Sequence, residues 1–145
     1  MNTEKHYCTF FVNNLLFGLE LLKVQEILSD YQVTPVPLAP KTVAGLVNHR
    51  GQIATVIDLR KCFGFPDSAC STAGPMHIAC GKDEPVGLLV DRINDVLSVN
   101  FNDFEPAPNN LHGSARDLIE GAYKLADRLL LPLRLESVAG IAQAS

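Results

Sequence analysis

Short apolar runs separated by turn-forming residues recur along this chain, a pattern typical of many short β-strands. Residues 7–12 are rich in aromatic and β-branched side chains, Asn13 and Asn14 have turn chemistry, and residues 15–19 are apolar again. This order predicts a β-hairpin. Helical spacing and strand alternation overlap over residues 21–28, so we expect a helical turn that leads into a strand.

The rest of the chain continues this pattern. Three prolines between residues 35 and 40 favour an exposed connection or a sheet edge. Asp58 is placed to cap a short helix over residues 60–63, with Gly64 as its stop. The other predicted strands are residues 43–48, 53–59, 76–80, 86–90, 93–99, 118–125 and 129–135, with a tight loop at residues 49–52.

An internal repeat suggests how the strands are grouped. The segment F-G-L at 17–19 with V-x-E-x-L at 24–28 is echoed by V-G-L at 86–88 with I-x-D-x-L at 93–97, at a constant offset of 69 residues. A duplicated β unit would give this offset, and so would chance combined with shared β patterning. Short strands with frequent turns favour small barrels over a βαβ fold.

The composition of residues 66–75 is that of a surface linker, rich in Pro, Ser, Ala and Gly without periodicity. We therefore expect a single domain, residues 1–145, with approximate subdomains at 7–66 and 76–138.

Composition narrows the class of protein. A chain of 145 residues with 47% apolar and 19% charged residues can bury a core without disulfides or metals. Twelve basic and sixteen acidic side chains give a net charge of −4 with no basic cluster, so nucleic acid is not an expected partner. The N-terminus lacks a signal sequence, and no apolar run approaches the roughly 20 residues that span a bilayer. We expect a cytosolic protein with four reduced cysteines.

Signatures of catalytic and metal sites are missing from the sequence, including phosphate-binding loops, zinc-protease motifs and nucleophile elbows. The best enzyme hypothesis pairs Cys62 with His49 as its base. A zinc site would need Cys70, His77 and Cys80. Burial of a small thiol and a surface histidine explain these residues better, so we expect no catalytic residue, metal or cofactor.

Charged residues at element boundaries have simpler interpretations. Asp58, Asp91 and Asp95 lie where capping and turn formation explain them. Arg50 stands beside Gly51 at a predicted hairpin tip, where a guanidinium is either a solvated charge or a multi-donor contact to a partner. Spacing alone favours the solvated charge.

Four stretches resemble one known family. They are F-G-L-E with L-K-V-Q-E-I at 17–27, G-L-V-N-H-R-G-Q-I-A-T-V-I-D-L-R at 45–60, V-G-L-L-V-D-R-I-N-D-V-L at 86–97 with P-A-P at 106–108, and D-R-L-L-L at 127–131. In this order they resemble the CheW-like family of chemotaxis coupling proteins, over about residues 7–138. The chain departs from the family pattern at His49, Ala54, Thr55 and Arg134, and its tail after Val138 is short.

The resemblance implies a mainly β fold of two intertwined five-stranded SH3-like barrels with short helices, which can exchange terminal strands. It implies a non-enzymatic adaptor that couples the cytoplasmic tip of methyl-accepting chemoreceptors to the regulatory domain of a CheA-type histidine kinase. Such a protein is cytoplasmic and reaches membrane receptor arrays through protein contacts, without inserting into the membrane. The alternatives are a scaffold of a non-flagellar pathway, such as twitching motility or second-messenger control, and a small Cys/His enzyme.

Site residues follow from the matching positions. The resemblance implies receptor contacts at Val24, Glu26 and Arg50. We expect His49 to pack against its neighbours rather than to act as a pH switch. The kinase contacts are expected in the loop that contains Asn48, His49 and Gly51.

Overall fold

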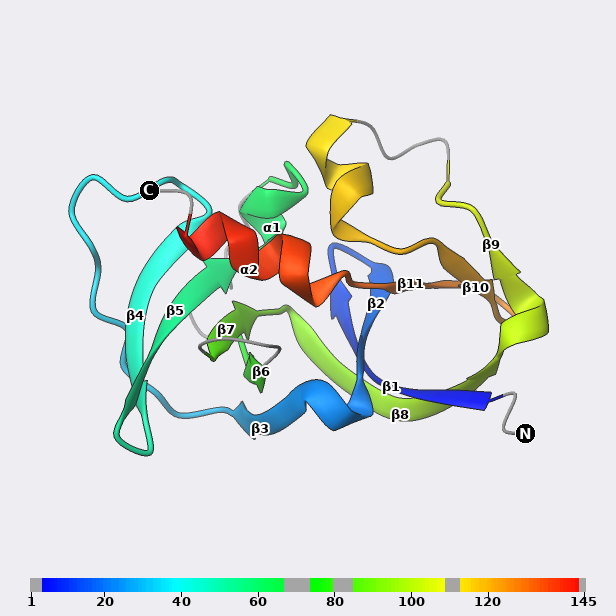
Figure 1. Ribbon diagram of the computed structural model, residues 1–145, viewed down its shortest axis with the longest axis horizontal. Helices are drawn as coiled ribbons and strands as arrows, with labels where there is room; N and C mark the ends of the chain where they lie inside the picture. Colours follow the sequence, from blue (N-terminus) through cyan, green and yellow to red (C-terminus); the bar gives the residue numbers. More distant parts are fainter. Residues whose placement is uncertain (1–3, 67–73, 80–84, 109–112, 144–145) are drawn as a thin grey trace.

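The computed structural model describes residues 4–66, 74–79, 85–108 and 113–143, which form two β-sheets with short helices (Figure 1). The elements, with η for 3₁₀ helices, are β1 (Glu4–Val12), β2 (Leu15–Glu20), η1 (Leu21–Lys23), β3 (Val24–Leu28), β4 (Val43–His49), β5 (Gln52–Asp58), α1 (Leu59–Cys62), β6 (Met76–Ala79), β7 (Val86–Leu89), β8 (Arg92–Asn100), η2 (Phe101–Asp103), β9 (Phe104–Glu105), η3 (Gly113–Leu118), β10 (Ala122–Lys124), β11 (Leu129–Pro132) and α2 (Leu135–Gln143).

The two sheets have the same internal order. The six-stranded sheet runs β8-β1-β2-β11-β10-β9, and the five-stranded sheet runs β3-β6-β7-β5-β4. Each has an antiparallel hairpin, β1–β2 or β6–β7, whose second strand pairs in parallel with β11 or β5. Apart from the two-residue β9, each sheet therefore has five strands in matching positions. The predicted fold of two intertwined five-stranded barrels is confirmed.

Strands cross between the sheets. After the β1–β2 hairpin the chain leaves the six-stranded sheet, and β3 pairs with β6 in the other. After the β6–β7 hairpin it returns, and β8 pairs with β1. Both predicted subdomain segments, 7–66 and 76–138, thus contribute strands to both sheets. The linker predicted at 66–75 lies largely outside the described residues, and the division into subdomains there stays a prediction.

The repeated sequence motifs occupy equivalent strands. Gly18 lies in β2 and Gly87 in β7, the second strands of the two hairpins. A Cβ atom at Gly18 would lie 3.1 Å from Tyr7 and Leu130, and one at Gly87 would lie 2.7 Å from the Met76 sulfur. Close packing across the hairpin therefore accounts for a glycine at the same place in both sheets.

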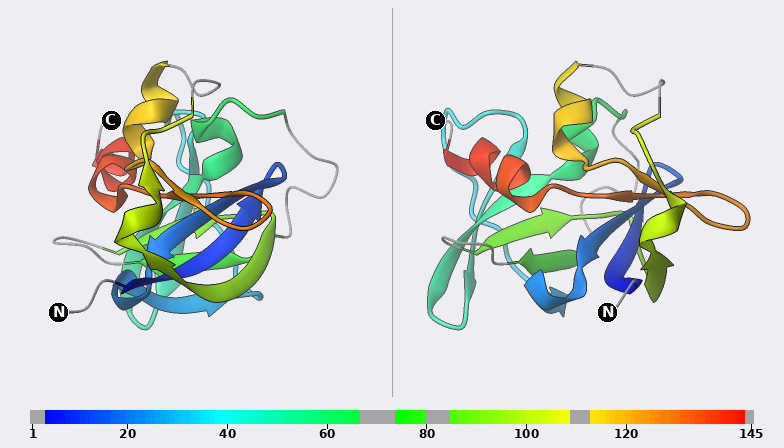
Figure 2. Two further views of the ribbon diagram at one scale, coloured as in Figure 1. Left: turned by 90° about the vertical axis from the view of Figure 1, so that its right-hand side faces the viewer. Right: turned by 45° about the vertical axis from the view of Figure 1, so that its right-hand side comes forward.

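The main core lies between the sheets and is covered by α2. Phe10 and Phe17 are fully buried there, and the Phe17 ring centroid lies 4.8 Å from that of Phe63. Leu135 and Val138 close the core from the apolar face of α2. Figures 1 and 2 show α1, α2 and η3 on one side of the molecule, while β3 and β8 run along the other.

Several local predictions are confirmed. Asn13 and Asn14 both have positive φ, 51° and 68°, as a tight hairpin turn between β1 and β2 requires. The Asp58 carboxylate accepts hydrogen bonds from the backbone N–H groups of Arg60 and Lys61 and so caps α1. The helical turn before β3 is η1.

Two predicted strands near the C-terminus are wrong in extent. Residues 118–125 contain the end of η3 and only the three-residue β10, because Ile119 forms an isolated bridge with Leu133 instead of continuing a ladder. The strand predicted at 129–135 ends at Pro132, which has no N–H to donate. The Arg134 carbonyl then accepts the N–H of Val138, and α2 begins. No helix in the described part of the chain is long and apolar enough to cross a bilayer.

Candidate functional site

The turn between β4 and β5 has a tightly specified backbone. His49 pairs with Gln52, and the two residues between them, Arg50 and Gly51, have φ of 52° and 82°. This is the left-handed geometry of a two-residue hairpin turn. The Asn48 side-chain oxygen accepts a hydrogen bond from the Gly51 N–H at 3.1 Å, so the sequence N-H-R-G fixes the turn that presents Arg50.

Glu26 connects this turn to β3. The Arg50 Nη2 donates to Glu26 Oε1 at 2.6 Å, and His49 Nδ1 lies 3.9 Å from Glu26 Oε2. Because β3 and β4 are the two edges of the five-stranded sheet, these contacts bridge its open edge. The structure therefore brings five predicted site residues into one cluster: Glu26, Asn48, His49, Arg50 and Gly51.

The exposure of the cluster decides what it can do. The Arg50 side chain is 78% exposed and the Glu26 side chain 31%, so their ion pair contributes at most about 1 kcal/mol to folding. A guanidinium has five N–H donors, and most of those of Arg50 face solvent. The interpretation of His49 as a surface histidine is wrong, because its side chain is buried at the end of β4. The cluster is suited to hydrogen bonding with a partner's polar or acidic group.

Val24 occupies a different environment from Glu26. Its side chain is partly buried and packs against the main core, and a register shift separates it from Glu26 in the β3–β6 ladder. The exposed side chains of β3 are those of Gln25 and Ile27, of which Ile27 is apolar. Val24 thus holds β3 against the main core through its side chain. Its contact with a receptor stays a prediction.

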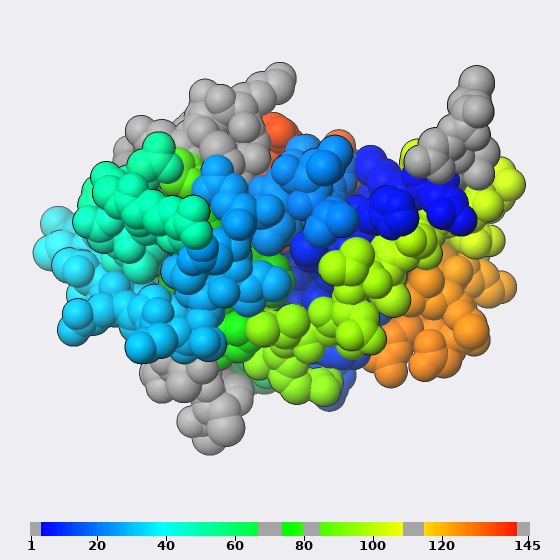
Figure 3. Space-filling view, turned by 90° about the horizontal axis from the view of Figure 1, so that it is seen from below, coloured from blue at the N-terminus to red at the C-terminus, as the bar shows by residue number. Residues whose placement is uncertain are grey.

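An apolar face that the sequence reasoning missed lies beside the cluster. Figure 3 shows β3 and β8 on one face of the molecule, with part of β1 between them. Ile27 on β3 is 39% exposed, and Ile93 and Val96 on β8 are 49% and 53% exposed. In β8, the alternating residues Leu97 and Val99 already face a core. Ile93 and Val96 are apolar as well, and these additional apolar residues were the signal in the sequence for an exposed apolar face. We call the surface of Ile27, Ile93 and Val96 the β3/β8 face.

Polar contacts between β1 and β8 hold this face in shape. The ladder has a register shift between Cys8 and Phe10, at Thr9. The Thr9 hydroxyl is buried, donates to the Asp95 carbonyl, and accepts from the Asn94 amide at 2.9 Å. These bonds satisfy the buried hydroxyl and fix the part of β8 between Ile93 and Val96.

The residues of the enzyme hypothesis lie apart. His49 ends β4 at the hairpin tip, whereas Cys62 follows the far end of β5, a strand of seven residues or roughly 20 Å. Burial, reinforced by the nearby Asp58 carboxylate, raises the pKa of Cys62 to about 12. At neutral pH this thiol is protonated and is not a nucleophile.

The zinc hypothesis involves His77 and two cysteines. His77 is fully buried in β6, with its ring centroid 4.8 Å from that of Phe10. Cys70 and Cys80, the other ligands of the zinc hypothesis, lie outside the described residues. Among the residues that the structure describes, no group of three or more His, Cys, Asp or Glu side chains could hold a metal ion.

Asp91 has a structural function. Arg60 donates two hydrogen bonds to its carboxylate, at 2.8 and 2.6 Å, and the Asn13 N–H donates a third at 2.8 Å. Burial opposes ionisation, but these hydrogen bonds outweigh it and lower the pKa of Asp91. The pair joins α1 to the turns that follow β1 and β7, away from the Glu26 cluster.

Comparisons with known proteins identify the family. Residues 6–143 match the family model described as "CheW-like domain". The chain is 28% identical to the chemotaxis protein CheW of Rhizobium meliloti (strain 1021), covering 94% of this chain and 88% of the relative. It is 30% identical to the chemotaxis protein CheW of Klebsiella aerogenes, covering 92% and 81%.

A solved structure agrees with these relatives. The crystal structure of the scaffolding protein TtCheW from Thermoanaerobacter tengcongensis has a TM-score of 0.80 and 29% sequence identity, covering 90% of this chain and 88% of that one. The likeness extends over both sheets rather than a single motif. The chain belongs to the CheW-like domain family, a family that includes chemotaxis scaffold proteins.

Proposed function

We propose that the chain is a non-enzymatic adaptor that couples methyl-accepting chemoreceptors to a CheA-type histidine kinase. The observation that carries the proposal is the β3/β8 face, an exposed apolar surface whose residue Ile27 directly follows Glu26, the ion-pair partner of Arg50. Apolar side chains surrounded by charged groups are typical of protein interfaces. A protein recruited to membrane receptors in this way needs no membrane-spanning segment of its own.

The receptor is proposed to contact the β3/β8 face. The cytoplasmic tip of such a receptor is a helical hairpin, and the apolar stripe of a helix can pack on an exposed apolar surface. Ile27, Ile93 and Val96 would supply the apolar contact, and Arg50 with Glu26 would set the register through polar groups at the border. Val24 is proposed to act indirectly, by holding β3 against the core.

The kinase is proposed to contact the β4–β5 turn. A Cβ atom on Gly51 would meet nothing within 4 Å, so the tip of the turn is open to a partner. The Asn48 side chain holds the tip in shape, and the buried His49 anchors it to the sheet. The turn and the β3/β8 face adjoin at Glu26, so one adaptor can contact both partners at neighbouring places.

A matched pair of variants tests the receptor surface. Ile27→Asp places a charge on the face, and Val36→Asp places the same charge on an equally exposed apolar residue, 39% in each case, in the connection between β3 and β4. We expect Ile27→Asp to weaken binding of a receptor cytoplasmic fragment at least about tenfold, the loss typical of an interface anchor. We expect Val36→Asp to bind normally. Isothermal titration calorimetry measures both, with circular dichroism as a check of folding.

A second pair tests the polar border. Arg50→Glu reverses the guanidinium charge beside Glu26, and Lys41→Glu reverses an exposed charge elsewhere in the chain. We expect only Arg50→Glu to abolish the ternary complex of receptor fragment, adaptor and kinase regulatory domain in a pulldown. If folded Ile27→Asp and Arg50→Glu proteins both form the complex normally, the proposed sites are wrong.

A further inference from the structure

The far end of the six-stranded sheet carries a second candidate binding surface. A hollow of about 460 Å³ lies between the β1–β8 pair and the β10–β11 turn. Its apolar lining is formed by Phe11, Leu16, Leu97 and Leu125, which belong to or pack against a small core cluster separate from the main core. Figures 1 and 2 show the β10–β11 turn at the opposite end of the molecule from the β4–β5 turn. The hollow is therefore far from the β4–β5 turn, and its lining includes none of the residues that define the β3/β8 face, although both involve β8.

Two arginines lie over the Phe11 ring, and one of them, Arg128, also lines the hollow. The guanidinium carbon of Arg92 is 4.3 Å from the centre of the Phe11 ring, and that of Arg128 is 5.1 Å from it. Both distances are within the range of cation–π contact. Two positive charges thus contact one ring at the surface of a chain whose net charge is −4.

Neither of these guanidinium groups is hydrogen-bonded to a carboxylate of the described residues. Arg128 Nε lies 3.7 Å from Asp127 Oδ2, too far for a hydrogen bond, and the Asp127 side chain is 76% exposed. Within the described residues, Arg92 donates no hydrogen bond to a side chain or to the backbone. Most guanidinium N–H donors at the hollow are consequently available to an outside acceptor.

The other sheet provides an internal comparison. The β4–β5 and β10–β11 hairpins have equivalent places in their sheets, and each turn carries an arginine. Arg50 is neutralised by Glu26 on the edge strand β3, at 2.6 Å. Arg128 instead lies over the Phe11 ring of β1, and its nearest carboxylate oxygen, that of Asp127, is beyond hydrogen-bond distance. The turn arginine is therefore hydrogen-bonded to a carboxylate in one sheet and lies over an aromatic ring in the other.

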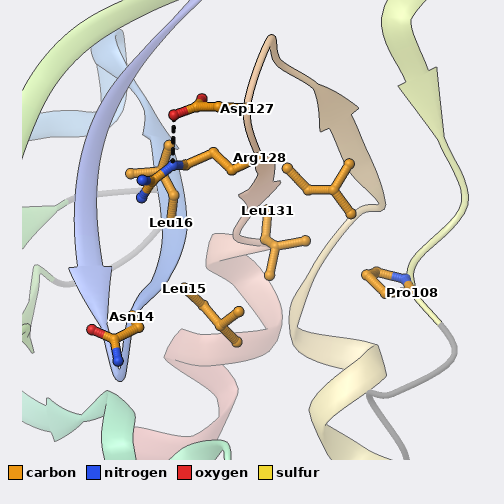
Figure 4. A pocket seen from close by; sticks show the side chains of 8 residues that line it. Asn14, Leu15, Leu16, Pro108, Asp127, Arg128 and Leu131 are labelled. Atoms are coloured by element: carbon orange, nitrogen blue, oxygen red, sulfur yellow. Dashed lines mark ion pairs between the residues drawn. The ribbon is translucent and has the colours of Figure 1, made fainter.

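A second hollow continues the surface on the other side of the turn. It has a volume of about 380 Å³ and shares Leu16, Asp127 and Arg128 with the first. Figure 4 shows Leu15 and Leu131 at its apolar side, with Pro108 opposite and the paired Asp127 and Arg128 at its border. An apolar side chain can therefore be accommodated on either side of the Arg128 guanidinium.

From this arrangement we infer that the β10–β11 end binds an acidic segment of a partner protein in which carboxylates are flanked by apolar side chains. Carboxylates match the planar donor array of a guanidinium, and the apolar side chains match the linings of the two hollows. Charge complementarity with two exposed arginines whose guanidinium groups donate to no carboxylate among the described residues selects this occupant over an uncharged apolar segment. The inference does not depend on the proposed adaptor function.

A pair of synthetic peptides tests it on the full chain. The first probe is acetyl-Leu-Asp-Glu-Phe-amide, and the second is acetyl-Leu-Asn-Gln-Phe-amide, which has similar shape without charge. We expect the acidic peptide to shift the amide NMR signals of Phe11, Leu97 and Leu125, and to bind at least tenfold more tightly than the neutral peptide.

Variants locate the binding. Arg92→Gln combined with Arg128→Gln should lower the affinity for the acidic peptide at least tenfold, and Lys61→Gln, an exposed cation on α1, should leave it unchanged. Both substitutions are at side chains that are not buried, so the folded state is expected to persist, and thermal melting checks this. Equal binding of the two peptides, unchanged binding by the double variant, or no shift at these residues at millimolar peptide would each overturn the inference.

Discussion

Replacing His77 by leucine should stabilise this protein and remove much of its sensitivity to mild acid. His77 is fully buried in β6, and within the described part of the molecule neither of its ring nitrogens has a hydrogen-bond partner. Such unsatisfied groups cost about 1–3 kcal/mol each. His77→Leu keeps an apolar side chain of similar size beside Phe10 and removes both nitrogens. We expect a gain of at least about 1 kcal/mol in the free energy of unfolding at pH 7.5.

The pH dependence follows from the same burial. Burial lowers the pKa of His77 from 6.5 to about 4, so the unfolded chain binds a proton more readily than the folded protein. The stability that the protein gains by keeping this imidazole neutral is therefore complete above pH 6.5, and it is lost as the pH falls from 6.5 towards 4. The loss amounts to about 2 kcal/mol at pH 5 and about 3 kcal/mol below pH 4. His77→Leu cannot show this loss.

Urea unfolding at pH 7.5, 6 and 5 measures the effect for the original protein and the variant. We expect the advantage of His77→Leu to grow by about 2 kcal/mol between pH 7.5 and 5. His6→Gln serves as the control, because it removes an exposed imidazole beside Ser98 and leaves the buried one in place. If the original protein and His77→Leu lose stability in parallel over this range, the buried imidazole does not control acid stability and the reasoning is refuted.

Three further predictions concern other parts of the fold. Gly45→Ala should lower the free energy of unfolding by at least about 2 kcal/mol, since the new Cβ would lie 2.3 Å from the Thr34 carbonyl oxygen. Chemical denaturation measures this, and Gly140→Ala, whose Cβ would have no atom within 4 Å, is the control. Arg60→Gln should lower the free energy of unfolding by about 2 kcal/mol, because the Asp91 carboxylate loses its ion-pair partner. In a double-mutant cycle, adding Asp91→Asn should restore part of this free energy. Full additivity would count against a direct Arg60–Asp91 interaction. Finally, because burial raises the pKa of Cys62 to about 12, alkylation of this thiol by iodoacetamide at pH 8, followed by mass spectrometry, should be at least about 100-fold slower in the folded than in the urea-unfolded protein.

The sequence predicted those parts of the fold that local chemistry determines. Asn13 and Asn14 specify a turn with positive φ, and the observed backbone has it. Asp58 specifies a helix cap, and its carboxylate accepts the expected N–H groups. The turn that presents Arg50 follows from Gly51 and from the Asn48 side chain in the same way. In each case the determining contacts lie within a few residues.

Features set by contacts between distant segments could not be predicted this way. Residues 118–125 look like a strand, but the long-range bridge of Ile119 to Leu133 ends the regular pairing. The ion pair between Glu26 and Arg50 forms because β3 and β4, the two edge strands of the five-stranded sheet, lie close together at this point. Motif resemblance supplied these site residues, whereas the β3/β8 face needed the exposures of individual side chains, because an apolar residue in a strand is usually buried.

The crossing of strands between the sheets also constrains how the chain can fold as it is synthesised. β2 emerges from the ribosome early but pairs with β11, whose residues are 129–132, and β1 pairs with β8 at residues 92–100. The apolar side chains of the first hairpin therefore stay exposed until nearly the whole chain has been synthesised, because the strands that cover them come late in the sequence. By contrast, the five-stranded sheet has all its strands by residue 89. We therefore expect the two barrels to be completed in the order opposite to that in which their first strands are made.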